Sequence, residues 1–128
     1  MFRVIIAGGR DFTDASLLFD KMDFFLQNVK EDIAIVCGMA KGTDQLGLQY
    51  AVQRGYKVHK YPADWDKYGK SAGYKRNCQM AKNADALVAF WDGQSKGTKH
   101  MIEYATQCGL KVRVVRYMIS SRKPTGKP

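Results

Sequence analysis

Short apolar segments alternate with amphipathic segments along most of the chain. Five apolar segments are short and bounded by glycine, proline or polar residues, as buried strands are, and they cover residues 2–8, 33–38, 56–62, 85–91 and 111–117. Four other segments carry apolar residues at spacings of three and four, the pattern of amphipathic helices, and they cover residues 15–29, 44–54, 74–82 and 99–108. Strand-like and helix-like segments therefore take turns from the N-terminus onward.

This alternation predicts an α/β fold, because a strand, a helix and a second strand in succession form a unit with parallel strands. We expect a Rossmann-like three-layer sandwich with a five-stranded, mainly parallel sheet in the order 3-2-1-4-5. In this order the loops after strands one and four meet at the switch point, where ligands of such sheets bind, and the loop after strand two lies beside them. Those loops read GGRDFTD (residues 8–14), DGQSKGT (92–98) and GMAKGTD (38–44).

The sequence Gly-x-x-Lys-Gly-Thr occurs twice, as a first copy at residues 38–43 and a second copy at 93–98. Each copy lies between a predicted strand and a predicted helix, where unpaired backbone N–H groups and the helix dipole attract anions. For either copy alone, an ordinary helix cap is an equally good interpretation, with Thr43 as the N-cap of the second predicted helix. Neither copy has the Walker A spacing, so a P-loop nucleoside triphosphatase is not supported.

Together, the three glycine-containing loops predict a phosphate site. Its expected residues are Gly8, Gly9, Arg10, Gly42, Thr43, Gly93, Gly97 and Thr98. Arg10 follows the first strand, where its guanidinium can bind a phosphate through two hydrogen bonds. A surface salt bridge with Asp11 or Asp14 is the alternative explanation for Arg10.

Other polar and aromatic residues near these loops are candidates for binding the rest of a nucleotide. Asp92 ends the fourth strand and can accept ribose hydroxyl groups or activate water, and its alternative role is to form the turn before Gly93. Trp65 and Tyr68 can stack on a base, or else pack on the edge of the sheet. Asp44 lies in the first turn of the second predicted helix, where the helix dipole favours a carboxylate with or without a ligand.

The net charge of +9 favours an anionic partner, such as a nucleotide, a phosphate ester or nucleic acid. Part of this charge lies in residues 119–128, which have no acidic residue and contain two prolines. We expect these residues to form a basic disordered tail after a domain of residues 1–118. Because acidic residues interrupt the basic runs of the domain, a small anionic ligand is favoured over nucleic acid, which remains an alternative.

The rest of the composition points to an ordinary intracellular domain. Three cysteines without a Cys-x-x-Cys spacing suggest neither a disulfide framework nor a zinc site, and buried free thiols explain them. We expect no metal and no required cofactor, only a bound nucleotide. No apolar run is long enough to cross a membrane and the N-terminus lacks a signal-peptide pattern, so we expect a cytoplasmic protein without membrane contact.

Four longer motifs, taken in order, make the chain similar to a known family. They read AGGRDFTD, CGMAKGTDQLGLQYA, YPADWDKYGKSAGYKRNCQMA and ADALVAFWDGQSKGTKHMIEYA. Through them the chain resembles the YspA/YpsA-related branch of the SLOG superfamily over nearly all of residues 2–117. The resemblance implies a Rossmann-like domain that binds nucleotides or nucleotide-derived ligands. The superfamily includes the Lonely Guy phosphoribohydrolases, which also suggest a homodimer, and the DNA-processing protein DprA.

The resemblance to the Lonely Guy proteins extends to single residues. Arg76 matches the arginine of their nucleotide site, while Gly97 and Thr98 match their phosphate-binding Gly-Thr. Their catalytic glutamate would fall three residues after Thr98, where this chain has Met101. Glu103 lies about 200° further around a helix, so its side chain does not project in the same direction. Glu103 and Asp92 are the two candidates for another acid–base role.

Three functional hypotheses follow. The first is a ligand-binding or sensing module for a nucleotide-derived molecule, such as NAD, ADP-ribose or a nucleoside mono- or triphosphate. The missing glutamate favours this hypothesis over the second, an N-glycosidic hydrolase of the phosphoribohydrolase type that acts on a nucleoside monophosphate. The third is a DprA-like DNA-binding accessory protein, although the loop shared with DprA is an element of the fold and does not by itself imply DNA processing.

Overall fold

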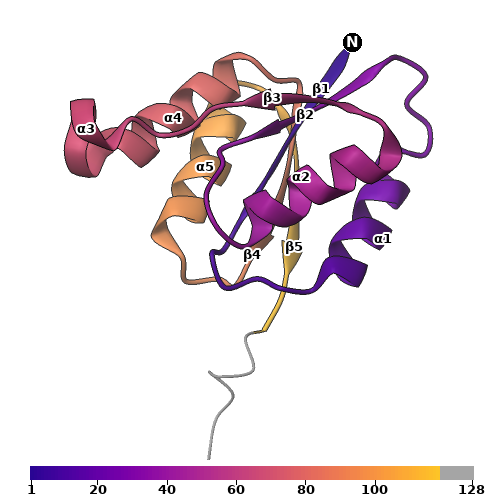
Figure 1. Cartoon of the computed structure of the whole chain (residues 1–128), viewed down its shortest axis with the longest axis horizontal. Helices are drawn as coiled ribbons and strands as arrows, with labels where there is room; N and C mark the ends of the chain where they lie inside the picture. Colours follow the sequence, from indigo (N-terminus) through magenta and orange to yellow (C-terminus); the bar gives the residue numbers. More distant parts are fainter. Residues whose placement is uncertain (119–128) are drawn as a thin grey trace, which may run out of the picture.

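The chain forms a parallel sheet that is covered by helices on both faces (Figure 1). A computed structural model describes residues 1–118, and the predicted basic tail at 119–128 lies outside the described residues. The elements are β1 (Phe2–Gly8), α1 (Ala15–Leu26), β2 (Ile33–Cys37), α2 (Thr43–Arg54), β3 (Lys57–Lys60), α3 (Trp65–Tyr68), η1 (Gly69–Ser71), α4 (Ala72–Lys82), β4 (Ala86–Trp91), α5 (Lys96–Gln107) and β5 (Lys111–Arg116). Within residues 1–118, no helix has the length and apolar character needed to cross a membrane.

The predicted sheet is confirmed, including its strand order of β3-β2-β1-β4-β5. Every strand pair is parallel, so the sheet is fully parallel rather than mainly so. The central strand β1 pairs with β2 on one side and with β4 on the other. The chain therefore changes direction across the sheet between β1 and β4, which places the switch point at their carboxyl ends.

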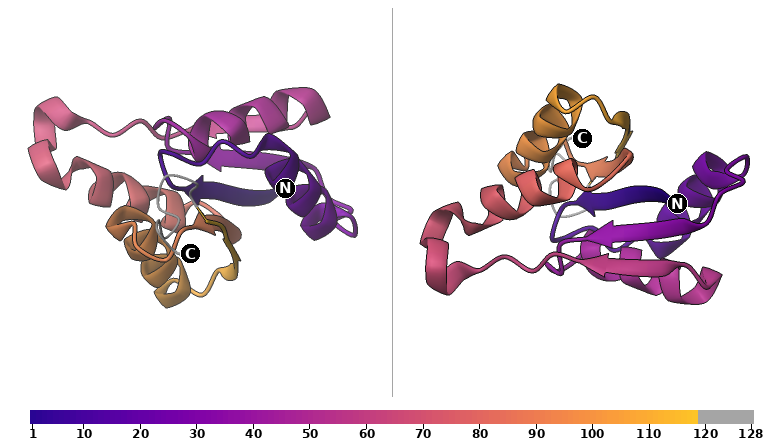
Figure 2. Two further views of the ribbon diagram at one scale, coloured as in Figure 1. Left: turned by 90° about the horizontal axis from the view of Figure 1, so that it is seen from below. Right: turned by 90° about the horizontal axis from the view of Figure 1, so that it is seen from above.

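Alternate residues of the strands pack against different helices, as the two-residue period of a strand requires. In β1, Val4 and Ile6 join the core under α1 and α2, whereas Ile5 and Ala7 join the core under α4 and α5. Figure 2 shows these two helix layers on opposite sides of the sheet. Because both faces are covered, the central strands are almost entirely apolar, and the exception is Arg3 near the start of β1, which pairs with Asp85.

The helix ends follow local capping. Asp14 is the N-cap of α1, as the sequence allows, and its carboxylate accepts a hydrogen bond from the backbone N–H of Leu17 at 3.0 Å. Gly55 ends α2 in the left-handed conformation with φ 73°, which glycine adopts readily. The prediction that Thr43 caps α2 was wrong, because Gly42 is the N-cap and Thr43 is the first helical residue.

Two helical segments begin earlier than their apolar patterns indicate. The segment expected as a loop after β3 contains α3 and η1, and it leads directly into α4. Asp64 caps α3 by accepting a hydrogen bond from the backbone N–H of Lys67 at 3.1 Å. Figure 2 shows that α3 lies away from the sheet at one end of the molecule. Helix α5 begins at Lys96 instead of residue 99, because Ser95 supplies an N-cap.

Candidate functional site

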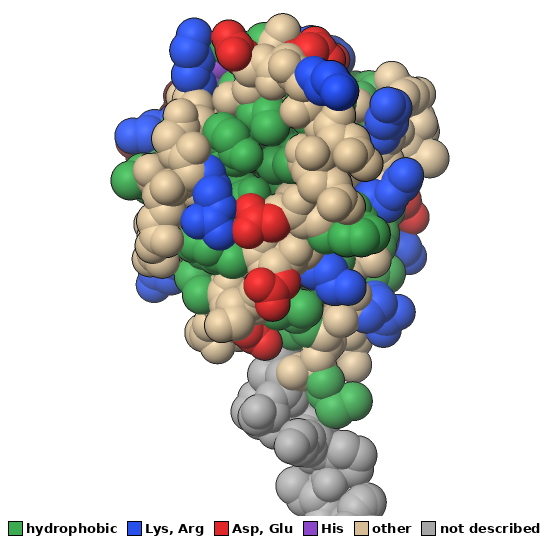
Figure 3. All heavy atoms as spheres, turned by 90° about the vertical axis from the view of Figure 1, so that its right-hand side faces the viewer, with side chains coloured by type: hydrophobic (Ala, Val, Ile, Leu, Met, Phe, Trp, Pro, Cys, Tyr) green, Lys and Arg blue, Asp and Glu red, His purple; other side chains and the backbone are tan. Residues whose placement is uncertain are grey.

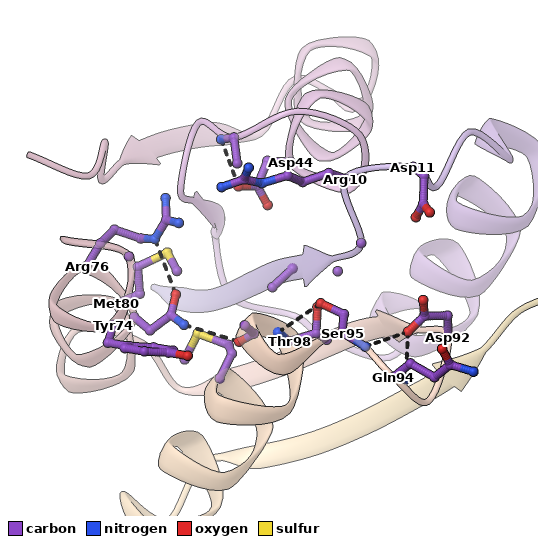
Figure 4. A pocket seen from close by; sticks show the side chains of 18 of the residues that line it. Arg10, Asp11, Asp44, Tyr74, Arg76, Met80, Asp92, Gln94, Ser95 and Thr98 are labelled. Atoms are coloured by element: carbon purple, nitrogen blue, oxygen red, sulfur yellow. Dashed lines mark hydrogen bonds between the residues drawn. The ribbon is translucent and has the colours of Figure 1, made fainter. Parts of the chain in front are cut away.

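A cavity of about 730 Å³ opens at the carboxyl ends of β1 and β4, the edge at which the strand order predicts a ligand site (Figure 4). Its wall combines the loop after β1, the start of α2, the segment from α3 to α4, and the loop from β4 into α5. Among the predicted site residues, the wall contains Gly8, Gly9, Arg10, Trp65, Arg76, Asp92, Gly97 and Thr98. It does not contain Gly42, Thr43, Tyr68, Gly93 or Glu103.

The first copy of Gly-x-x-Lys-Gly-Thr supports the loop after β1. Thr43 is fully buried, and its hydroxyl donates a hydrogen bond to the carbonyl oxygen of Gly9 at 2.9 Å. The backbone N–H of Thr43 donates to the same oxygen at 3.1 Å. Gly42 has φ 69°, and a Cβ atom there would lie 2.3 Å from the carbonyl oxygen of Arg10. Gly42 and Thr43 thus pack the start of α2 against the loop after β1.

The loop before α5 is organised by two short polar side chains. The carboxylate oxygen Oδ1 of Asp92 accepts hydrogen bonds from the backbone N–H groups of Gln94 and Ser95, both at 2.8 Å. The hydroxyl of Ser95 then accepts a hydrogen bond from the backbone N–H of Thr98 at 3.4 Å and lies 3.2 Å from the hydroxyl of Thr98. Asp92 is therefore a turn-forming residue as well as part of the cavity wall.

Gly97 is a glycine that neither a positive φ nor a close contact among the described residues requires. It lies in the first turn of α5 and lines the cavity. Outside its own turn of the helix, no atom of residues 1–118 would lie within 4 Å of a Cβ atom at this position. Glycine is less favourable than alanine in a helix, by roughly 0.5–1 kcal/mol in the interior, so the packing of the described residues gives no reason for a glycine here.

Arg76 of α4 brings a partly buried cation to the opposite part of the wall. Its Nη1 donates a hydrogen bond to the carbonyl oxygen of Gly38, and its Nε donates to the side chain of Asn77 at 3.2 Å. Burial lowers the pKa of Arg76, Asp44 raises it and Arg10 lowers it further. The guanidinium nevertheless remains charged at any physiological pH, so burial leaves a cation that is poorly solvated.

Asp44 lies beside the two arginines of the cavity, and Figure 4 shows Arg10 extending along it with Arg76 on the other side. The side chain is 7% exposed, and its Oδ2 accepts a hydrogen bond from the backbone N–H of Ala40 at 2.9 Å. Burial raises the pKa of Asp44, while the hydrogen bond from Ala40 and the two arginines lower it. Asp44 offsets part of the positive charge without forming an ion pair of 4.0 Å or less among the described residues.

Comparison with known proteins identifies the family of the chain. A family model described as the YspA, cpYpsA-related SLOG family matches residues 2–68, from β1 to the end of α3. The chain belongs to this SLOG family. The resemblance inferred from the sequence motifs is thereby confirmed.

Relatives of this SLOG-family chain include the Gene 61 protein of Mycobacterium phage D29. The two sequences are 34% identical over 118 residues, which cover 88% of this chain and 94% of the phage protein. The alignment therefore extends over nearly the whole of both sequences.

Two solved structures share the fold. DNA processing protein A (DprA) from Streptococcus pneumoniae has a TM-score of 0.71 at 19% identity, over 94% of this chain and 52% of the DprA chain. A structural genomics target named TM1055 has a TM-score of 0.64 at 22% identity, over 88% of this chain and 72% of that chain. This SLOG-family chain therefore spans about half the length of DprA, and identities this low show a common fold only.

In this SLOG-family chain, the cavity also contains side chains that the sequence analysis did not single out. Asn77, Tyr74 and Met80 line it from α4. The thioether of Met80 forms an apolar part of the wall together with that of Met101, the residue in the place of the missing glutamate. Met101 is 1% exposed. Apart from the position of Asn77 beside Arg76, no local pattern marks these residues, because their meeting depends on how α4 and α5 cross.

The predicted stacking aromatics differ in their placement. Trp65 lines the cavity and is 50% exposed, so its ring is accessible to a ligand. Tyr68 does not line the cavity, and the ammonium groups of Lys67 and Lys75 lie 5.1 and 4.9 Å from its ring centre. The second aromatic ring of the wall is instead Tyr74, which packs on the ring of His100 at a centre-to-centre distance of 4.4 Å.

Proposed function

We propose that this cavity binds a nucleotide or nucleotide-derived small molecule through a phosphate group, and that the protein acts as a ligand-binding or sensing module. The observation that carries the proposal is Gly97. It leaves the backbone of the first turn of α5 accessible from the cavity, although no contact among the described residues requires a glycine there. Glycine at the start of a helix allows an anion to approach the backbone N–H groups and the positive end of the dipole.

The two arginines of the cavity supply the matching positive charge. Among the described residues, no carboxylate oxygen lies within 4.0 Å of a guanidinium nitrogen of Arg10 or Arg76. A phosphate would therefore gain charge-assisted hydrogen bonds without displacing an existing ion pair. Since Arg76 is also partly desolvated, such bonds would be stronger than those of a surface arginine.

The remaining wall is suited to the organic part of a nucleotide. The volume of about 730 Å³ lies within the range of pockets that enclose small ligands. Trp65 and Tyr74 offer accessible rings for stacking on a base, which contributes roughly 1–3 kcal/mol per base. Met80 and Met101 add polarizable apolar surface beside them.

Hydrolysis of the ligand is less well supported than binding. Met101 occupies the position at which the resemblance to phosphoribohydrolases calls for a glutamate, and a thioether cannot transfer a proton. Oδ1 of Asp92 already accepts two backbone hydrogen bonds, and Glu103 does not line the cavity. If the protein were a hydrolase, free base would appear when a nucleoside monophosphate is incubated with it, and the release would stop in Arg76→Ala.

Nucleic-acid binding is also less well supported. On the face shown in Figure 3, lysine and arginine side chains are scattered and acidic side chains lie among them, so the face has no continuous basic stripe. The likeness to DprA lies in the fold. A DNA-binding role would require affinity to fall steeply with salt, by about one unit of log–log slope per phosphate neutralised.

Ligand identification by release and by stabilisation tests the proposal. Purified protein is denatured and the supernatant is examined for nucleotides, and the native protein is melted with AMP, GTP, NAD or ADP-ribose. At a hundredfold excess over Kd, a ligand should raise the free energy of unfolding by about 2.7 kcal/mol. Failure of every compound to release or stabilise would contradict the proposal.

Two arginine variants make this test specific. Arg76→Gln should weaken binding by about 10- to 100-fold, because a hydrogen bond to a charged group contributes about 1.5–3 kcal/mol. Arg113→Gln is the matched control, since Arg113 is exposed on the edge strand β5 and does not line the cavity. Equal loss of affinity in both variants would indicate a diffuse charge effect instead of a site.

A further inference from the structure

Asn77 connects Arg76 to the beginning of α5. It is 7% exposed and lies on α4, where it lines the cavity. Its side-chain oxygen accepts a hydrogen bond from Nε of Arg76 at 3.2 Å. Its side-chain nitrogen lies 3.4 Å from the carbonyl oxygen of Gly97 and 3.2 Å from Nδ1 of His100.

These partners determine which way the amide of Asn77 points. An arginine Nε–H can only donate, so it must face the amide oxygen, and a carbonyl oxygen can only accept, so it must face the amide nitrogen. The amide nitrogen therefore also faces His100, to which it can only donate. It follows that Nδ1 of His100 is an acceptor without a proton, and that the neutral imidazole carries its proton on Nε2.

A proton on Nδ1 of His100 is incompatible with this arrangement. Two donors would then face each other across 3.2 Å. Rotation of the Asn77 amide by half a turn would present its oxygen to the imidazolium, but it would also turn the amide nitrogen toward Nε of Arg76, which is a donor as well. The charged form of His100 and the hydrogen bond from Nε of Arg76 to Asn77 therefore exclude each other, and the bond from Nη1 of Arg76 to Gly38 is unaffected.

The surroundings of His100 determine the pH at which it becomes protonated. Tyr74 of α4 packs on one side of the imidazole, and Tyr104 of α5 lies 6.0 Å away between ring centres. Glu103, on α5, is the acidic residue whose charge acts on the ring. Burial lowers the pKa of His100 below its usual 6.5, and Glu103 partly opposes this by raising it. Protonation of His100 is thus shifted to a lower pH than that of an ordinary histidine.

We propose that Asn77 is a positioning residue that couples the protonation of His100 to the placement of Arg76, so that acidification weakens the anion site. The coupling itself depends only on the contacts among these three residues. Its effect on affinity rests on the function proposed above for the cavity. Direct electrostatics predicts the opposite sign, because a second cation near the cavity would increase affinity for an anion as the pH falls.

Nuclear magnetic resonance of the ligand-free protein tests the coupling without any assumption about function. The Nε–H resonance of Arg76 should shift with the same midpoint as the imidazole resonances of His100. In His100→Gln this shift should vanish, and in His59→Gln, which changes the other histidine of the chain, it should persist. The coupling is overturned if the Arg76 resonance does not move at the His100 midpoint, or moves equally in His100→Gln.

Titration with sulfate between pH 5 and pH 8 tests the effect on affinity, because sulfate keeps its charge over this range. Sulfate affinity should fall by about tenfold or more as His100 becomes protonated, the equivalent of one hydrogen bond to a charged group, and it should not fall in His100→Gln. An affinity that rises with acidification would overturn the proposed effect. Absence of sulfate and nucleotide binding at pH 8 would count against the proposed function, while the resonance measurement would still decide the coupling.

Discussion

The two copies of Gly-x-x-Lys-Gly-Thr have the same residue types but different places in their helices. In the first copy the helix begins after the second glycine, so Gly42 is the N-cap and Thr43 is the first helical residue. In the second copy the helix begins at the lysine, so Gly97 and Thr98 are already inside the first turn. The same six positions therefore present different atoms to the cavity.

The residue at the third position of each copy accounts for the difference. The second copy has Ser95 there, and its hydroxyl caps the helix by accepting the N–H of Thr98. The first copy has Ala40, which has no capping group, and its own N–H is instead bound by Asp44. Sequence identity in a short motif does not establish equal function, because capping residues decide which backbone groups are left open.

Substitution of the second glycine by alanine should give the largest contrast between the copies. Gly42→Ala should lower the free energy of unfolding by about 2 kcal/mol or more, because a positive φ is strained for alanine and Cβ would meet the carbonyl of Arg10. Gly97→Ala should leave stability unchanged or raise it by up to about 1 kcal/mol. Urea denaturation of both variants measures the contrast, and equal destabilisation would contradict the distinction between the copies.

Removal of the threonine hydroxyl should give a smaller contrast. Thr43→Val loses a buried hydrogen bond to Gly9 and should lower stability by about 1–2 kcal/mol. Thr98→Val should cost about 0.5 kcal/mol, because the capping hydrogen bond from the backbone N–H of residue 98 to the hydroxyl of Ser95 remains. Denaturant midpoints of the two valine variants would test this order, and a larger loss in Thr98→Val would refute it.

Substitution of the residue that follows each copy should give the smallest effect on stability, and this effect depends on pH. The first copy is followed by Asp44, whose pKa burial raises above the usual 3.8, and the second by the exposed Lys99. Between the unfolded and folded pKa values, the folded state binds more protons, so stability is lost as the pH rises through this window. The Asp44→Asn variant should not show this loss of stability with rising pH, whereas the Lys99→Gln variant should show it.

The difference in unfolding free energy between wild type and Asp44→Asn, measured from pH 3 upward, tests the sign. As the pH rises, the Asp44→Asn variant should become more stable relative to the wild type. A change in favour of the wild type would mean that the hydrogen bond from Ala40 and the two arginines outweigh burial.

The strands could be predicted because each central strand is buried on both faces and so is almost entirely apolar, and their alternation with helices gave the Rossmann-like order. The glycine loops could be placed at one edge because topology brings strand ends together, whereas Arg76 was assigned to the site only by its match to the Lonely Guy proteins. The short helix α3 could not be predicted, because four residues capped by Asp64 have no apolar period. The roles of Thr43, Asp44 and Asn77 depend on contacts between separate segments, which a local pattern does not encode.

The central claim is that the second copy, together with Arg76, forms an anion site for a nucleotide, and Gly97→Ala tests it most directly. Wild type and variant are titrated with the compound of the AMP, GTP, NAD and ADP-ribose panel that stabilises the wild type most. We predict that the variant, at equal or greater stability, loses at least about tenfold in affinity, because the added methyl group occupies space that only a ligand would fill. Equal affinity of wild type and Gly97→Ala would contradict the claim.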